Sequence, residues 1–369
     1  MFKKNENFKY YLVSILTFSF QILFISIAKE FKNEFIFYIQ IISLSSLVLG
    51  LLGSLQFYID LNNTSKKILI NVNKQLIWLF IAAILIIVLY YLVNKPILSI
   101  LFFTTFLSLV MVLVQSAIYA RQGNMMGNSY LFFINNFCRL LILIVAYVFN
   151  YNFYYSVIAS NIIIIYIYKN AITIPKFTSN NKKKFNFLSS INNFIGGSIT
   201  SYDKLYASKY LVEFASNYYI IFRVASIFQS LTEIIFRKER FDITSYKINK
   251  LDYSKIYKKI YFCFFTLIIL FIMISNINYI IPLLKNANLN FLISFFEILR
   301  LYKIEFALIS LSFIINSIAS LKYDLIYVNH GKNLLFVCNV LNFIVFFALL
   351  VLFASSVETL CLIFFIIQV

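Results

Sequence analysis

The chain has 369 residues, of which 62% are hydrophobic, 19% are aromatic and only 12% are charged. A soluble fold cannot bury that much apolar surface, so composition excludes a soluble globular protein and favours a membrane protein. The formal net charge is +18. Because the basic residues lie in short connections between apolar segments, this charge indicates the cytoplasmic side of a membrane and not nucleic-acid binding.

Twelve apolar segments follow one another along the chain, and most have about the 20 residues that a bilayer core requires. We predict membrane-spanning helices at 9–28, 35–58, 76–94, 97–120, 128–149, 153–168, 187–203, 214–236, 260–280, 304–327, 333–354 and 357–369, the last of them shorter. Lys3 and Lys4 precede the first segment without a small-residue cleavage site. We therefore expect that segment to be retained as a helix.

The basic residues support this layout. With the N-terminus in the cytoplasm, 22 of the 32 lysines and arginines fall in cytoplasmic connections and eight in outer ones. This asymmetry predicts a multi-pass protein of the inner, cytoplasmic membrane with a cytoplasmic N-terminus. The remaining two, Arg139 and Arg223, lie inside predicted spans.

The longest polar stretch after the sixth span divides the spans into two groups of six. We expect an all-α polytopic protein with an N-terminal lobe at 1–170, a cytoplasmic linker at 171–186 and a C-terminal lobe at 187–369. Two six-helix lobes related as repeats around a central cavity are typical of a duplicated transporter. A short interfacial helix is expected at 291–300.

The stretch 193–237 predicts a polar face within a hydrophobic hairpin. Asp203 and Lys204 are expected in its outer turn, and Tyr219, Arg223 and Ser226 follow at steps of four and three. Such steps keep the three side chains on one face of a helix.

Two other spans carry similar faces. In span five, Asn135 and Arg139 lie four residues apart, and in span seven Asn193 begins a stripe of small and polar residues. Stripes of small residues are more typical of helix packing than of ligand binding.

The two arginines are different, because a charge deep in a membrane span is costly and usually faces a cavity or a partner. Guanidinium stays charged and presents a planar fork of donors that suits phosphate oxygens. We therefore predict an anionic ligand, held in a cavity formed by Arg139, Asn135, Asn193, Asp203, Tyr219, Arg223 and Ser226.

Three stretches resemble bacterial polysaccharide flippases of the multidrug/oligosaccharidyl-lipid/polysaccharide superfamily. Residues 201–240 look like helices seven and eight of that family, in which an Asp and a basic residue close helix seven and helix eight opens with Tyr and continues through an Arg. The matching positions are Asp203, Lys204, Tyr218 or Tyr219, and Arg223. Residues 115–149 are similar to the turn between helices four and five, and residues 326–366 to helices eleven and twelve.

The resemblance implies a transporter that moves undecaprenyl-diphosphate-linked oligosaccharide from the inner to the outer leaflet, with membrane lipids as its surroundings. It implies alternating access driven by an ion gradient, hence a coupling cation, and not an enzyme. No GxxxxGK[ST] loop occurs, so ATP is not expected as the energy source. We expect no cofactor, no metal, no nucleic-acid partner and a monomer.

Two alternatives remain open. An O-antigen polymerase or ligase is also a many-spanning membrane protein, but it needs a large outer loop with Arg, His or acidic groups. A drug exporter of the same superfamily would need an acidic cavity for cationic drugs, whereas the deep charges of this chain are mostly basic.

Overall fold

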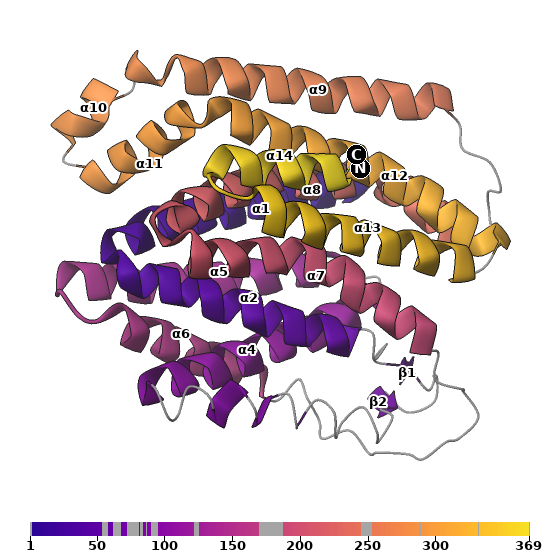
Figure 1. Ribbon diagram of the computed structural model, residues 1–369, viewed down its shortest axis with the longest axis horizontal. Helices are drawn as coiled ribbons and strands as arrows, with labels where there is room; N and C mark the ends of the chain where they lie inside the picture. The colour runs from indigo at the N-terminus through magenta and orange to yellow at the C-terminus, as the bar shows by residue number, and fades with distance from the viewer. Residues whose placement is uncertain are drawn as a thin grey trace. The chain divides into compact units, whose positions relative to one another are not determined.

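The computed structural model describes residues 2–53, 58–61, 68–71, 81, 84–85, 87–89, 95–121, 125–169, 187–244, 253–279, 281–287, 289–330 and 332–368. Helices make up nearly all of these residues, in agreement with the predicted all-α class (Figure 1). Two compact units, Met1–Ser201 and Tyr202–Val369, divide the chain. The predicted linker at 171–186 lies outside the described residues.

The helices of the first unit are α1 (Phe2–Ala28), η1 (Lys29–Phe31), α2 (Asn33–Gly53), α4 (Pro96–Arg121), α5 (Met125–Val148), α6 (Phe153–Tyr168) and the first part of α7 (Phe187–Tyr210). Helices α1, α2, α4, α5 and α6 pack on one another. Helix α1 packs on α5, while α4 packs on α2, α5 and α6. Helices α2, α4 and α6 are apolar around their whole circumference. Such helices belong in a large core or in a membrane.

A short antiparallel β-hairpin follows α2. Strand β1 (Tyr58–Leu61) pairs with β2 (Ile68–Asn71), with Tyr58 opposite Asn71 and Leu61 opposite Ile68. These strands were not predicted, and the predicted helix at 35–58 is wrong at its end, because α2 ends at Gly53 and Tyr58 already belongs to β1. Tyr58 and Ile59 in β1 and the two isoleucines of β2 favour extended backbone.

Three chain segments meet at one end of the first unit. The carboxylate of Glu34, at the start of α2, accepts hydrogen bonds from Asn152 Nδ2 (2.9 Å) and from the backbone N–H of Phe153 (2.8 Å) at the start of α6. Lys95, which precedes α4, places its ammonium 4.1 Å from the ring centre of Phe37 in α2. The starts of α2 and α4 and the turn between α5 and α6 therefore lie together.

The second unit is organised around α12. Its elements are the end of α7, α8 (Val212–Thr244), α9 (Tyr253–Ser275), η2 (Ile277–Tyr279), α10 (Ile281–Asn286), α11 (Asn290–Leu301), α12 (Lys303–His330), α13 (Lys332–Phe353) and α14 (Val357–Gln368). Helix α12 contacts α8, α9, α11, α13 and α14. Helix α9 runs beside α12 and continues into the short helices α10 and α11 (Figure 1). A helix is thus present where the sequence predicted one at 291–300.

Among the described residues, four helical stretches are long and apolar enough to cross a membrane. They are Leu12–Phe31, Pro96–Leu113, Ser129–Val148 and Ser254–Ser275. Shorter apolar helices occur at Asn33–Leu49, Phe153–Tyr168, Val337–Phe353 and Val357–Ile367. This content is that expected of a membrane protein, while the count of twelve spans stays a prediction. Most of the predicted span at 76–94 lies outside the described residues.

One boundary differs from the prediction in a way that changes the site. Helix α7 continues to Tyr210, and α8 begins at Val212. Asp203 and Lys204 therefore belong to the body of α7. The predicted position, in an outer turn, is wrong. Their charges were interpreted as a helix boundary, but both side chains are buried, 1% and 5% exposed, and they pair with each other. The pairing lets two charged residues remain within a packed helix.

Candidate functional site

Amide and charged side chains are seldom buried, and the described part of the chain buries five of them. They are Gln115, Asn135, Asn161, Asp203 and Lys204. The first three belong to helices α4, α5 and α6 of the first unit, and the last two belong to α7 in the second unit. Each unit therefore has a buried polar site of its own.

The first site is formed where α4, α5 and α6 pack on one another. On α4, Thr105, Ser108 and Gln115 follow at steps of three and seven, and on α5, Asn135 and Arg139 are four apart. These steps place each set on one face of its helix. Thr105 and Ser108 are fully buried, whereas Arg139 is half-buried.

Asn161 of α6 lies at the centre of the first site and is fully buried. Its Oδ1 accepts hydrogen bonds from Ser108 Oγ (3.1 Å) and from Arg139 Nη2 (3.3 Å), and its Nδ2 donates to Thr105 Oγ1 (3.0 Å). The Ser108 hydroxyl also lies 2.8 Å from the carbonyl oxygen of Thr105, so its single proton is shared between two acceptors. One amide thus joins all three helices.

The guanidinium of Arg139 fixes which way this amide points. Guanidinium only donates hydrogen bonds, so the Asn161 atom that faces it is the carbonyl oxygen, and the NH2 group must point toward Thr105. Asn161 is a neutral acceptor. In the part of the chain that the structure describes, no carboxylate pairs with Arg139. Its positive charge is oriented but not neutralised.

Three buried polar atoms on α4 and α5 have no hydrogen-bond partner among the described residues. They are Gln115 Oε1, Asn135 Oδ1 and Arg139 Nε. A buried polar atom without a partner is costly and calls for an explanation, such as a water or a ligand. One of the three atoms is a donor, suited to an anionic oxygen, and two are acceptors, suited to hydroxyl groups.

The second site is an ion pair within α7 that is hydrogen-bonded to a tyrosine of α8. One carboxylate oxygen of Asp203 accepts from the ammonium of Lys204 at 3.1 Å and from the Lys204 backbone N–H at 2.7 Å. The other oxygen accepts from the hydroxyl of Tyr218, which is fully buried. The sequence named Tyr218 only as an alternative to Tyr219 for the tyrosine that opens helix eight.

Aromatic rings enclose this pair. The Lys204 ammonium lies 3.4 Å from the ring centre of Phe222, within the range of a cation–π interaction. Phe222 in turn packs against Phe313 and Phe364, at ring-centre distances of 5.4 and 5.1 Å. The carboxylate of Asp203 is thus engaged by Lys204 and Tyr218 within an aromatic cluster, which is the arrangement of a structural ion pair.

Arg223 lies one turn beyond Tyr219 on α8, as its spacing predicts. Its Nε donates to the Tyr219 hydroxyl at 3.0 Å, and its guanidinium carbon lies 5.1 Å from the centre of the same ring. The Ser226 hydroxyl donates to the Arg223 carbonyl oxygen at 2.6 Å. Ser226 is thereby bonded within its own helix. Asn193 belongs to α7, and its side chain lies outside the described part of the structure.

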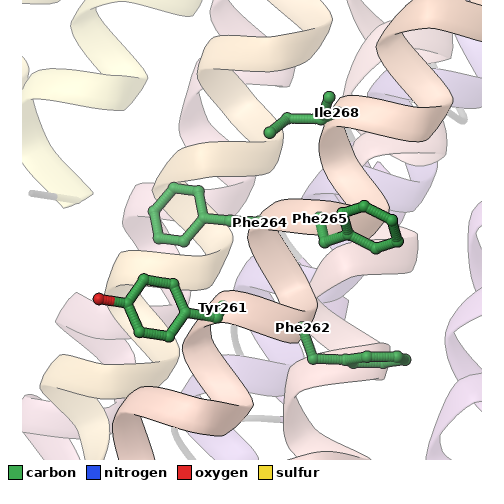
Figure 2. Close-up of a pocket in the computed structure, with 5 residues that line it drawn as sticks. All are labelled: Tyr261, Phe262, Phe264, Phe265 and Ile268. Atoms are coloured by element: carbon green, nitrogen blue, oxygen red, sulfur yellow. The ribbon is translucent and has the colours of Figure 1, made fainter.

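An apolar hollow of about 510 Å³ lies elsewhere, on α9. It is lined by Tyr261, Phe262, Phe264, Phe265 and Ile268. Figure 2 shows that all five side chains come from this single helix and spread to both of its sides. Apart from the Tyr261 hydroxyl this surface is apolar, and it suits hydrocarbon.

No group of three His, Cys, Asp or Glu side chains that could hold a metal ion occurs in the part of the chain that the structure describes. The four cysteines are free, two of them buried and two half-buried.

Asn135 and Arg139 were predicted from their spacing, whereas Asn161, Thr105 and Ser108 were not predicted to join Arg139. Asn161 is followed by four isoleucines, and a lone amide in such a run forms no polar stripe on its own helix. Its importance comes from contacts with α4 and α5, 22 to 56 residues away along the chain. The one available signal was an amide in an otherwise apolar span.

The chain was compared with known families and proteins. No family model, no curated protein and no solved structure matches it.

Proposed function

We propose that this chain is a transporter of the inner, cytoplasmic membrane that moves an undecaprenyl-diphosphate-linked oligosaccharide from the inner to the outer leaflet. One observation carries the proposal. Arg139 lies half-buried among three packed helices, and its hydrogen-bond partner among the described residues is the neutral amide of Asn161. A positive charge in such surroundings is costly unless an anion accompanies it, at least part of the time.

The chemistry of the first site suits a diphosphate attached to a sugar. Arg139 supplies donors to phosphate oxygens, with its Nε–H lacking a partner among the described residues. The carbonyl oxygens of Asn135 and Gln115 also lack described partners and are acceptors for sugar hydroxyls. Arg223 and Tyr219 provide a second cationic and hydroxyl-bearing group in the other unit. The resemblance of residues 115–149, 201–240 and 326–366 to polysaccharide flippases supports the same ligand class.

The mechanism follows from the proposed ligand. Arg139 neutralises the diphosphate, amides and hydroxyls bind the glycan, and the polyprenyl tail stays in the membrane. Two lobes of six helices then expose the ligand alternately to each side, driven by an ion gradient. Asp203 and Lys204 neutralise each other, so we assign them a structural role in this cycle.

The decisive experiment measures which leaflet accumulates lipid-linked glycan in a strain that lacks this protein. Loss of a flippase traps the glycan on the inner leaflet. Loss of a polymerase or ligase leaves single units on the outer leaflet, and loss of a drug exporter changes neither. Either of the last two results contradicts the proposal.

A further inference from the structure

The neutrality of Asn161 is the feature of the first site that the proposed function does not explain. An arginine within a helix bundle is usually paired with a carboxylate, as Lys204 is with Asp203 in the second unit. Arg139 is held instead by an amide that is itself fixed by a hydrogen bond to Thr105. An amide orients a guanidinium as a carboxylate does, but it leaves the full positive charge in place.

The geometry points to a positioning role for Asn161. We propose that Asn161 holds Arg139 as an oriented and un-neutralised cation, so that the guanidinium keeps its charge for the phosphate oxygens of an anionic ligand. The inference rests on the proposed function for the identity of the ligand, a diphosphate. It adds that residue 161 must be a neutral acceptor, because a carboxylate there competes with the ligand for the same cation.

Asparagine and aspartate have nearly the same shape, which makes the inference testable at a single position. Asn161→Asp keeps an oxygen for Arg139 and Ser108 but adds a negative charge beside the guanidinium. We expect this variant to fold, because the new ion pair offsets the loss of the Nδ2 hydrogen bond to Thr105. We also expect it to bind a diphosphate poorly.

The test uses the full chain, purified in detergent, and inorganic diphosphate as the probe. The dissociation constant is measured by calorimetry, and the thermal unfolding midpoint without the probe is recorded for each variant. We expect Asn161→Asp to weaken binding at least about tenfold, equivalent to about 1.4 kcal/mol, with an unfolding midpoint close to that of the wild type. Asn161→Leu removes the acceptor altogether and should lower both binding and the midpoint.

Ser160→Ala is the matched control. Ser160 is the neighbouring residue on α6, it is buried, and its hydroxyl donates to the Val157 carbonyl oxygen of its own helix. This variant should bind diphosphate within about twofold of the wild type, a difference of less than 0.5 kcal/mol.

Two results overturn the inference. One is wild-type protein that does not bind diphosphate, and the other is an Asn161→Asp variant that folds and binds it as well as the wild type does. If Asn161 had only a structural role, a variant would lose diphosphate binding only when its unfolding midpoint also falls. The leaflet experiment separates this inference from the proposed function. An unchanged glycan distribution in the strain that lacks the protein contradicts the function. A difference in diphosphate binding between the wild type and Asn161→Asp supports the inference in either case.

Discussion

Lys204 and Arg139 are both cations within helix packing, and the partner of each determines what it can do. Lys204 is paired with Asp203 at 3.1 Å and lies against the ring of Phe222. That pair is close to neutral and needs no ligand. Arg139 is held by the Asn161 amide and retains its charge. The first arrangement stabilises a fold, and the second is suited to attract an anion.

The ion pair predicts a specific stability effect. Asp203→Asn preserves the shape of the side chain and an acceptor for Tyr218, but it leaves the buried Lys204 ammonium without its carboxylate. Breaking a buried pair in this way typically costs about 3–5 kcal/mol. We expect a loss of that order in the free energy of unfolding, measured by chemical denaturation in detergent.

The double variant Asp203→Asn/Lys204→Met is the control for this prediction. It removes both charges and keeps an apolar chain against Phe222, so we expect it to recover most of the lost stability. A double variant as unstable as Asp203→Asn alone would show that the buried charge is not the cause.

Arginine at position 139 should be hard to replace, even by lysine. Lysine keeps the charge but lacks the planar fork that donates to Asn161 and to phosphate together. A hydrogen bond to a charged group contributes about 1.5–3 kcal/mol, or about ten- to a hundredfold in rate. We expect Arg139→Lys to slow transport about tenfold and Arg139→Gln about a hundredfold, measured as glycan translocation in proteoliposomes.

Arg300→Lys tests whether this sensitivity is specific to the site. Arg300 is exposed, and its Nη1 donates to Asn278 Oδ1 at 2.6 Å. The same substitution there should leave transport unchanged. Equal losses for Arg139→Lys and Arg300→Lys would argue against a ligand at Arg139.

The candidate site could be predicted from the sequence only as far as single helices extend. Asn135 and Arg139 were found because their spacing marks one face of α5. Asn161 was missed because its partners, Thr105 and Ser108, lie on a helix more than 50 residues away along the chain. Periodicity describes one helix face at a time and says nothing about which faces meet.

At the scale of elements, apolar segments bounded by polar turns were predicted well. The predicted helix at 153–168 coincides with α6, which is capped by Asn152 accepting from the Tyr154 backbone N–H. The end of α7 was predicted wrongly. Charges normally mark the end of a span, but the Asp203–Lys204 pair is satisfied by Tyr218 and lies inside the helix. Only the contact with Tyr218 distinguishes a charged pair buried inside a helix from charges that end a span.

Glu34 connects two elements and should therefore affect stability. Its carboxylate accepts the backbone N–H of Phe153, a helix N-terminal group that the helix itself cannot satisfy, and the side chain of Asn152. Loss of a cap typically costs about 0.5–2 kcal/mol. We expect Glu34→Ala to lower the free energy of unfolding by about 1–2 kcal/mol, because a charge-assisted hydrogen bond is also lost. Glu297→Ala, at an exposed position on α11, should change it by less than about 0.5 kcal/mol.

At the scale of the whole molecule, the sidedness of the connections stays a prediction, and the contacts within each unit show which connections lie at the same end. The segments around Lys95 and Asn152, both predicted to be outer, meet the start of α2 at one end of the first unit. In the second unit, Lys259 of α9 donates to the Ile235 carbonyl oxygen of α8 at 2.8 Å, beside the predicted cytoplasmic connection at 237–259. A basic connection at this point is what the positive-inside rule requires of the cytoplasmic face.

This alternation predicts which exposed residues face which side of the membrane. Tyr151, Lys209 and Lys169 are exposed and lie in or next to connections. In a background without Cys138, Cys263, Cys338 and Cys361, we expect Tyr151→Cys and Lys209→Cys to react with a membrane-impermeant maleimide in intact cells. Lys169→Cys should react only after the membrane is opened, because it borders the predicted cytoplasmic linker.

The opposite pattern at all three positions would show that the protein has the opposite orientation in the membrane. Labelling of Tyr151→Cys and Lys169→Cys from the same side would instead show that α6 does not cross the membrane, since its 16 residues would then have to lie along one surface.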